Sequence, residues 1–184
     1  MKTTYKNSIR SKALIRDAVI KLLVKNQDLN RVTVTDIVKE ANINRGTFYN
    51  HYNNVADVVY EMKDELVDKM DTALQKLTPN DIDNIKTFFD ITTKFLQENE
   101  QIYKSIYPYV SKEILYGMSN RIIKEARSRI VANTNITEMD LYILGNGIAG
   151  TYMQYFANNI SYSLTQLRDE SIKTIYKFLN FTEK

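Results

Sequence analysis

The stretch Thr33–Tyr52, TVTDIVKEANINRGTFYNHY, determines the interpretation of this sequence. Thr33 can cap a helix, and Asp36, three residues later, is favoured beside the positive N-terminal end of that helix. Asn42 tolerates the left-handed backbone that a tight turn requires, and Asn44 can cap a further helix. The stretch therefore predicts two short helices joined by a turn of about three residues.

The second of these helices separates apolar from polar side chains. Phe48 and Tyr52 are four residues apart, so we expect both to pack inward on one face. The residues expected to face outward are Arg45, Thr47, Tyr49 and His51. Two short helices arranged in this way predict a helix-turn-helix, whose second helix enters the major groove of DNA.

Amphipathic helices are predicted on both sides of this stretch. The helix before it runs from about Ser8 to Asn26, with a buried stripe expected on Leu14, Ala18 and Leu22 beside Ile15 and Val19. A longer helix after it is capped by Asn53 or Asn54 and ends near Leu77. A turn follows at 78–81, and the remaining helices are expected at 82–98, 101–107, 111–131, 137–158 and 164–181.

No stretch shows the alternation of a β-strand, so the predicted fold is all-α with about nine helices. Residues 1–54 are expected to form a three-helix helix-turn-helix domain, and residues 55–184 a helical bundle.

The charge divides in the same way. Residues 1–54 hold ten Lys and Arg against four Asp and Glu, a net of +6, whereas residues 55–184 hold fifteen against eighteen, a net of −3. A basic N-terminal domain favours a polyanionic partner, although chance variation could also produce this imbalance.

The segment Thr47–Tyr52 resembles a motif of the TetR family of transcriptional regulators. Members typically show Ala-Gly-Val-Ser, a variable pair, and then Thr-Phe/Leu-Tyr-x-His-Phe. The corresponding residues here are Ala41-Asn42-Ile43-Asn44, Arg45-Gly46 and Thr47-Phe48-Tyr49-Asn50-His51-Tyr52. The resemblance covers about residues 10–60, a third of the chain, and implies a dimeric regulator that binds DNA, most commonly a repressor.

The resemblance implies a role for each residue of the motif. Arg45 and Thr47 would reach base edges with Thr35 nearby, and Arg45 is the best candidate for specificity because a guanidinium can bond guanine bidentately. Tyr49 and His51 would contact phosphates, unless they serve only in packing. The DNA-binding set is completed by Thr33 at its helix start, Asn44 as a cap and Gly46, which allows close backbone approach.

Val55 departs from the family pattern. In the family this position, at the start of the fourth helix, is usually a Lys that contacts phosphate. The absence of this Lys should weaken affinity for DNA unless Lys2, Lys6 or Arg10 compensates. A second class of function therefore stays open. In this alternative the chain is a helical co-regulator or ligand-binding protein that acts through a protein partner with little affinity for DNA.

The C-terminal part implies a dimer and a sensor. Family members dimerise through their last two long helices, here 137–158 and 164–181, bind palindromic operators, and place a small-molecule effector among the C-terminal helices. The segment Phe95–Asn99 with Ile102-Tyr103 also resembles regulators of dihydroxyacetone kinase genes, some of which act through protein partners. Nine of the thirteen tyrosines follow residue 100. They could line a pocket or belong to the core, and the candidate ligand residues are Tyr103, Tyr107, Tyr116, Tyr142 and Tyr152.

Two other patterns favour structural roles. Gly145-Asn146-Gly147-Ile148-Ala149-Gly150 matches a dinucleotide-binding fingerprint, but that site needs a preceding strand, and the flanking residues keep helical spacing. We expect these glycines to allow close approach of another helix. The carboxylates of the fourth helix alternate with lysines and lack a histidine neighbour, so a solvated face is expected and no metal.

Composition limits the remaining possibilities. The chain has no cysteine, and its one histidine, His51, lies in the DNA motif, so we expect no enzymatic activity and no cofactor. The opening residues are polar, and no run of about 18 apolar residues occurs. These features predict no membrane association and a cytoplasmic location.

Overall fold

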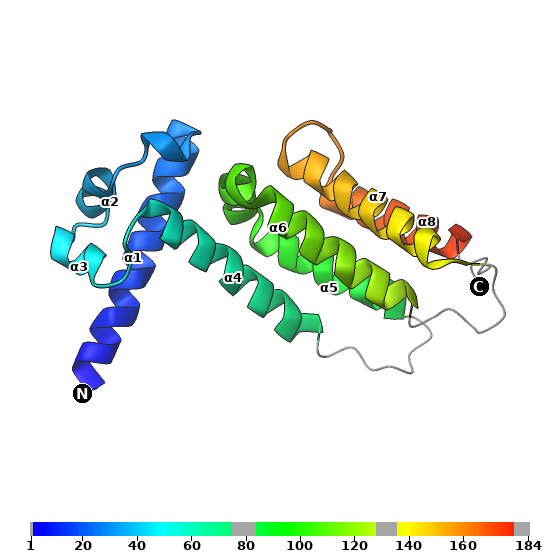
Figure 1. The fold of residues 1–184 in the computed structure, drawn as a ribbon, viewed down its shortest axis with the longest axis horizontal. Coiled ribbons are helices and arrows are strands. Elements are labelled where there is room, and N and C mark those ends of the chain that lie inside the picture. The colour runs from blue at the N-terminus through cyan, green and yellow to red at the C-terminus, as the bar shows by residue number, and fades with distance from the viewer. Residues whose placement is uncertain (1, 75–83, 128–135, 179–184) are drawn as a thin grey trace. The chain divides into compact units, whose positions relative to one another are not determined.

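Helices form all the regular secondary structure in residues 2–74, 84–127 and 136–178, which are the residues that the computed structural model describes (Figure 1). They are α1 (Lys2–Asn26), the 3-10 helix η1 (Leu29–Arg31), α2 (Val34–Glu40), α3 (Arg45–Tyr49), α4 (Val55–Leu74), α5 (Asn84–Glu98), α6 (Glu100–Arg127), α7 (Glu138–Phe156) and α8 (Leu164–Phe178). The predicted all-α fold is confirmed. None of these helices combines the length and apolar character needed to cross a bilayer.

The chain forms two compact units, residues 1–66 and 67–184, and the division falls inside α4. The predicted turn at 78–81 lies outside the described residues, as do the ends predicted for the helices that were expected to finish near 77, 131 and 181.

In the first unit, α1 packs against α2 and α3. Ile15 and Val19 are completely buried on α1, and Ala18 and Leu23 are nearly so. The predicted burial of Ala18, Ile15 and Val19 is confirmed, whereas Leu22 is half-buried and the prediction for Leu14 is wrong, because Leu14 is 37% exposed. The apolar stripe is therefore rotated slightly toward Ile15 and Leu23, and the position of the packing partners decides this rotation.

The helices α2, α3 and α4 each contribute a fully buried side chain to this core. Ile37 comes from α2, Phe48 from α3 and Val58 from α4, each with no exposed surface. Replacing Phe48 by a small residue would leave a cavity, which typically costs about 3–5 kcal/mol in a protein core. The short α3 is therefore held mainly by Phe48.

The second unit is a bundle of α5, α6, α7 and α8. Each of these helices packs against two others, with α6 beside α7 and α5 beside α8 as the most extensive pairs. The bundle core contains apolar side chains from all four helices: Phe89, Leu96, Ile106, Leu141, Ala149, Tyr152, Leu164 and Ile175.

The two helices predicted at 101–107 and 111–131 lie on either side of a kink within α6. Val110 leaves the helical conformation, with φ −130° and ψ 22°, two residues after Pro108. Proline lacks the N–H of a helical hydrogen bond and crowds the preceding turn, so it produces a kink. The predicted interruption between the two helices is therefore confirmed as this kink.

A glycine permits the close approach of α6 and α7. A Cβ at Gly145 would lie 2.5 Å from Cγ1 of Ile123 and 3.2 Å from the carbonyl oxygen of Ser119. One residue further on, the hydroxyl of Ser119 donates to Oδ1 of Asn146 at 3.0 Å. The G-x-G-x-x-G sequence lies entirely inside α7, and Gly145 has the packing role that was predicted. A Cβ at Gly147 or Gly150 would meet no atom within 4 Å, so neither of these glycines has that role within the described chain.

Candidate nucleic-acid interface

Reciprocal hydrogen bonds fix the start of α2. The Asp36 N–H donates to Oγ1 of Thr33 at 3.2 Å, and the Thr33 N–H donates to Oδ2 of Asp36 at 3.1 Å. The Thr33 hydroxyl also donates to that oxygen at 2.6 Å. These hydrogen bonds lower the pKa of Asp36, so its carboxylate stays charged at the helix N-terminus. The predicted cap is confirmed, and the polar groups of Thr33 are engaged within the chain.

A Schellman turn ends α2 and leads into α3. Asn42 has the left-handed φ of 50° that was expected of it. The Ile43 N–H donates to the Val38 carbonyl at 3.0 Å, and the Asn42 N–H donates to the Lys39 carbonyl at 3.3 Å. This turn places the next cap, Asn44, directly before α3.

Asn44 organises the first turn of α3. Its Oδ1 accepts the Thr47 N–H at 2.7 Å and the Thr47 hydroxyl at 2.9 Å. A Cβ on Gly46 would lie 3.3 Å from the same oxygen. The absence of a side chain at Gly46 therefore leaves room for the Asn44 cap, a role that the sequence interpretation had not considered.

The two faces of α3 differ as expected. Phe48 is completely buried and Tyr52 is 4% exposed, and their rings lie 5.9 Å apart. Arg45 is exposed, Tyr49 is 50% exposed, and Thr47 and His51 are half-buried. On α2, Thr33 and Thr35 are exposed. In Figure 1, α2 and α3 lie on the same side of α1.

In the first unit, the cations that form ion pairs do so with carboxylates of the same unit. Lys12 pairs with Glu61 at 2.7 Å, Arg16 with Glu65, Lys21 with Glu40 at 3.2 Å, and Arg31 with Asp28 at 3.6 Å. Among the ion pairs between described residues, none includes Arg45. The guanidinium on the outer face of α3 is therefore available for another partner.

A polar network joins Tyr52 to α1 and α4, and the sequence interpretation missed it. The Tyr52 hydroxyl donates to Oε1 of Glu61 at 2.9 Å, and Nζ of Lys12 lies 5.5 Å from the centre of the Tyr52 ring. Burial alone would raise the pKa of Glu61, but hydrogen bonds from Lys12 and Tyr52 outweigh it and lower this pKa. The available signal was Tyr52 itself, since the family motif ends in Phe at this position.

The start of α4 carries a carboxylate and no cation. Oδ1 of Asn54 accepts the Asp57 N–H at 3.0 Å, and the Asp57 carboxylate accepts the Asn53 N–H at 2.9 Å. The bond from the Asn53 backbone is the main reason for the lowered pKa of Asp57. Val55, between these groups, is half-buried.

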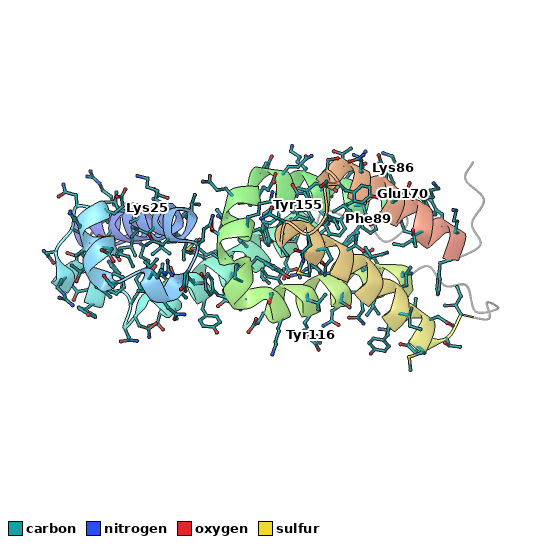
Figure 2. The ribbon with its side chains drawn as sticks, turned by 90° about the horizontal axis from the view of Figure 1, so that it is seen from above. Lys25, Lys86, Phe89, Tyr116, Tyr155 and Glu170 are labelled. Atoms are coloured by element: carbon teal, nitrogen blue, oxygen red, sulfur yellow. The ribbon has the colours of Figure 1, made fainter. Side chains whose placement is uncertain are left out.

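The five candidate ligand tyrosines occupy different environments. Tyr103 and Tyr152 are 6% and 1% exposed, and Tyr103 stacks on Phe156 at 5.2 Å. Burial raises the pKa of Tyr152 to about 12. Tyr107 is half-buried, whereas Tyr142 is 48% exposed and Tyr116 is 72% exposed and projects from α6 (Figure 2). The structure therefore brings two of the five into the core.

The described residues thus combine a helix-turn-helix with a separate α-helical bundle. No protein-family model matches the chain. A segment of 54 residues, 29% of this chain, is 33% identical to the uncharacterised HTH-type transcriptional regulator YxbF of Bacillus subtilis. The matched segment spans only 14% of that relative's length.

Solved structures match nearly the whole chain. The dihydroxyacetone kinase operon activator DhaS is 16% identical, with a TM-score of 0.64 over 95% of this chain and 98% of that chain. A TetR transcriptional regulator from Streptococcus agalactiae is 18% identical, with a TM-score of 0.67 over the same shares of the two chains. The chain has the fold of TetR-type transcriptional regulators, which confirms the family resemblance at the level of the fold.

Proposed function

We propose that this protein is a sequence-specific DNA-binding transcriptional regulator that acts as a homodimer on a palindromic operator. The observation that carries the proposal is the exposed Arg45 on the capped helix α3, outside every ion pair between described residues. The net charge of +6 over residues 1–54 supports the same partner, because cations neutralise phosphates and release counterions. We propose repression as its effect on transcription. DhaS, which shares the fold, is named an activator.

The residues of the proposed interface have two kinds of role. Arg45 and Thr47 read base edges with Thr35, while Tyr49 and His51 contact phosphates. Thr33 and Asn44 act mainly by capping α2 and α3, and Gly46 leaves space for the second cap. Residues 1–54 form the DNA-binding domain in this proposal.

Residues 55–184 form the dimerisation and sensing domain. Tyr103 and Tyr152 are the candidates for an internal effector site, since both are buried and carry a hydroxyl. Tyr107, Tyr116 and Tyr142 are closer to the surface and suit a protein partner better. The proposal includes no cofactor, no catalytic step and no membrane contact, and it places the protein in the cytoplasm.

The second candidate is a co-regulator of the same fold with little affinity for DNA. The start of α4 favours it, because Val55 is apolar and the Asp57 carboxylate would repel a phosphate there. In this case the bundle would bind a protein partner, and replacement of Arg45 would not change the affinity for that partner.

Fluorescence anisotropy on the DNA upstream of the protein's own gene, titrated with salt, distinguishes the candidates. The variants are Arg45→Ala and, as a matched control, Lys25→Ala, which removes an exposed cation at the end of α1 (Figure 2). We expect wild type to prefer the operator over a scrambled duplex. Arg45→Ala should lose about 1–3 kcal/mol of this preference, whereas Lys25→Ala should weaken binding to both duplexes equally.

Equal, weak binding of the wild type to every fragment of a genomic library would contradict the proposal and favour the co-regulator. An Arg45→Ala variant with unchanged preference would contradict the role of Arg45. A promoter–reporter fusion then determines the sign of regulation, and deletion of the gene should raise expression if the protein represses.

A further inference from the structure

Among the described residues, four buried side-chain polar atoms have no hydrogen-bond partner, and all four belong to the bundle. They are Oδ1 of Asp90, Oγ1 of Thr92, Oγ1 of Thr93 and the hydroxyl of Tyr152. Thr93 is 2% exposed and Tyr152 is 1% exposed. A buried hydroxyl without a partner is costly, so such a group usually bonds either to the protein or to an internal water.

Thr93 differs from other hydroxyl groups in the helices. Thr72, Ser105 and Thr151 each donate to the backbone carbonyl four residues earlier, at 2.8, 2.8 and 2.9 Å. Ser119, which is buried on α6, donates to a side-chain amide of α7 at 3.0 Å. Thr93 makes neither kind of hydrogen bond. Its hydroxyl is therefore available to a partner that the described chain does not supply.

Contacts between α5 and α8 place Thr93 on the seam between these two helices. Nη1 of Arg168 lies 3.2 Å from Oδ1 of Asp90, and Nε2 of Gln97 donates to Oγ1 of Thr165 at 3.3 Å. Thr93 follows Asp90 by three residues and precedes Gln97 by four. It therefore lies on the same face of α5, between the two contacts.

Hydroxyl groups from three helices meet at this seam. Ser171 is 8% exposed and follows Arg168 by three residues on α8, and Tyr152 comes from α7, which packs against α8. Burial raises the pKa of Tyr152 to about 12, and Ser171 and Thr93 lie close enough to affect the same pKa. The hydroxyls of Thr93, Tyr152 and Ser171, here called the hydroxyl cluster, are therefore neighbours without a hydrogen bond between any two of them.

We propose that the hydroxyl cluster binds an uncharged hydroxylic molecule, which is water in the free protein and joins α5, α7 and α8 by hydrogen bonds. A water can donate to some hydroxyls and accept from others at the same time. Buried waters in proteins typically make about three hydrogen bonds to polar groups that would otherwise be unpaired, which matches the three hydroxyls. The proposal goes beyond the proposed function and does not depend on DNA binding.

The surroundings of the cluster select an uncharged molecule. Hydroxyl groups carry no net charge, and the charged groups that act on Tyr152, Arg168 and Asp169, are paired with each other at 2.7 Å. An added ion would bring an unpaired charge into the core, which is costly. The hydroxyl of a small neutral organic molecule supplies the same chemistry as water and is a second source of it.

Isosteric removal of single hydroxyls tests the proposal. If the cluster binds water, Thr93→Val and Tyr152→Phe each remove a hydrogen bond and should raise the equilibrium constant for unfolding about fivefold. If the hydroxyls have no partner, the same changes remove a buried polar group without loss of a bond and should lower this constant. Urea unfolding at one protein concentration measures it. Thr151→Val, at an exposed position of α7, is the matched control and should change the constant by about twofold or less.

Combined replacement tests whether the three hydroxyls share one bound molecule. Thr93→Val, Tyr152→Phe and Ser171→Ala together remove every hydroxyl of the cluster, so no buried polar group is left without a partner. We expect the triple variant to raise the unfolding constant less than the product of the three single effects, because effects on a shared partner are not additive. Fully independent effects would overturn the shared molecule.

A crystal structure of the full chain identifies the bound molecule directly. We expect an isolated density peak about 2.7–3.2 Å from at least two of the three hydroxyl oxygens. Density for a larger molecule with a hydroxyl at this point identifies the second source and supports the same site. Hydroxyls bonded to one another with no peak between them, or stabilisation by both Thr93→Val and Tyr152→Phe, would overturn the proposal. Neither result bears on DNA binding, which the anisotropy assay decides.

Discussion

Replacement of Glu61 tests the polar network that joins three helices of the first unit. Glu61 accepts the Tyr52 hydroxyl at 2.9 Å and Nζ of Lys12 at 2.7 Å, so it connects α4 to the segment that follows α3 and to α1. Glu61→Ala removes both interactions. Glu61→Gln removes the charge but keeps an oxygen that can accept the Tyr52 hydroxyl.

The two interactions should differ in strength. The side chains of Lys12 and Glu61 are 36% and 29% exposed, so water screens the ion pair and its contribution is about 1 kcal/mol or less. Tyr52 is 4% exposed, and a buried hydroxyl without an acceptor costs about 1–3 kcal/mol. We expect Glu61→Ala to lower the free energy of unfolding by about 2–3 kcal/mol and Glu61→Gln by about 1 kcal/mol.

Urea unfolding followed by circular dichroism at fixed protein concentration measures these changes. A double-mutant cycle with Tyr52→Phe isolates the hydroxyl. On the Tyr52→Phe background, Glu61→Ala should cost only the contribution of the Lys12 ion pair. An equal cost of Glu61→Ala on both backgrounds would refute the assignment of the larger share to the Tyr52 hydrogen bond.

Three further predictions follow from the structure. Val55→Lys should tighten DNA binding and steepen the dependence of log K on log salt by about one, as measured by anisotropy; an unchanged slope would show that position 55 does not reach phosphate. Gly145→Ala should destabilise the bundle by about 1–3 kcal/mol in urea unfolding, because its Cβ would lie 2.5 Å from Cγ1 of Ile123; equal or greater stability would contradict the tight α6–α7 contact. Acid should destabilise the protein, because hydrogen bonds from Lys104 and Tyr155 lower the pKa of Glu100. The stabilisation is complete above the unfolded pKa of about 4.3 and is lost as pH falls through the folded pKa. Between pH 6 and 3, the urea midpoint should fall less in Glu100→Gln than in wild type. Parallel plots of midpoint against pH would exclude the Glu100 carboxylate as a source of the acid destabilisation.

The parts of the fold that depend on neighbouring residues could be predicted from the sequence. The caps at Thr33 and Asn44 and the left-handed Asn42 involve groups no more than three residues apart, so residue type and spacing were sufficient. Phe48 and Tyr52 were assigned to the buried side of α3 for the same reason. The family resemblance added the expected pattern of the helices around them.

The parts that depend on tertiary contacts could not be predicted. The choice between Leu14 and Ile15 on α1 depends on where α2 and α3 lie, and the hydrogen bond from Tyr52 to Glu61 joins side chains that no helical spacing relates. Exposure of Tyr116 and burial of Tyr152 likewise depend on the faces that α6 and α7 turn to their neighbours. At Pro108, by contrast, the sequence did indicate the interruption, because the effect of a proline on its own helix is local.

In the proposed function, where Thr47 reaches a base edge, the cap of α3 would also affect base selection. The Thr47 hydroxyl donates its hydrogen to Oδ1 of Asn44, so its oxygen can offer only lone pairs to a further partner. In the major groove, adenine and cytosine present an amino group, whereas guanine and thymine present acceptors at the equivalent edge. We therefore expect operators selected from random DNA to be enriched in adenine or cytosine at the base that Thr47 reaches. Thr47→Val should remove that enrichment and leave the base beside Arg45 unchanged.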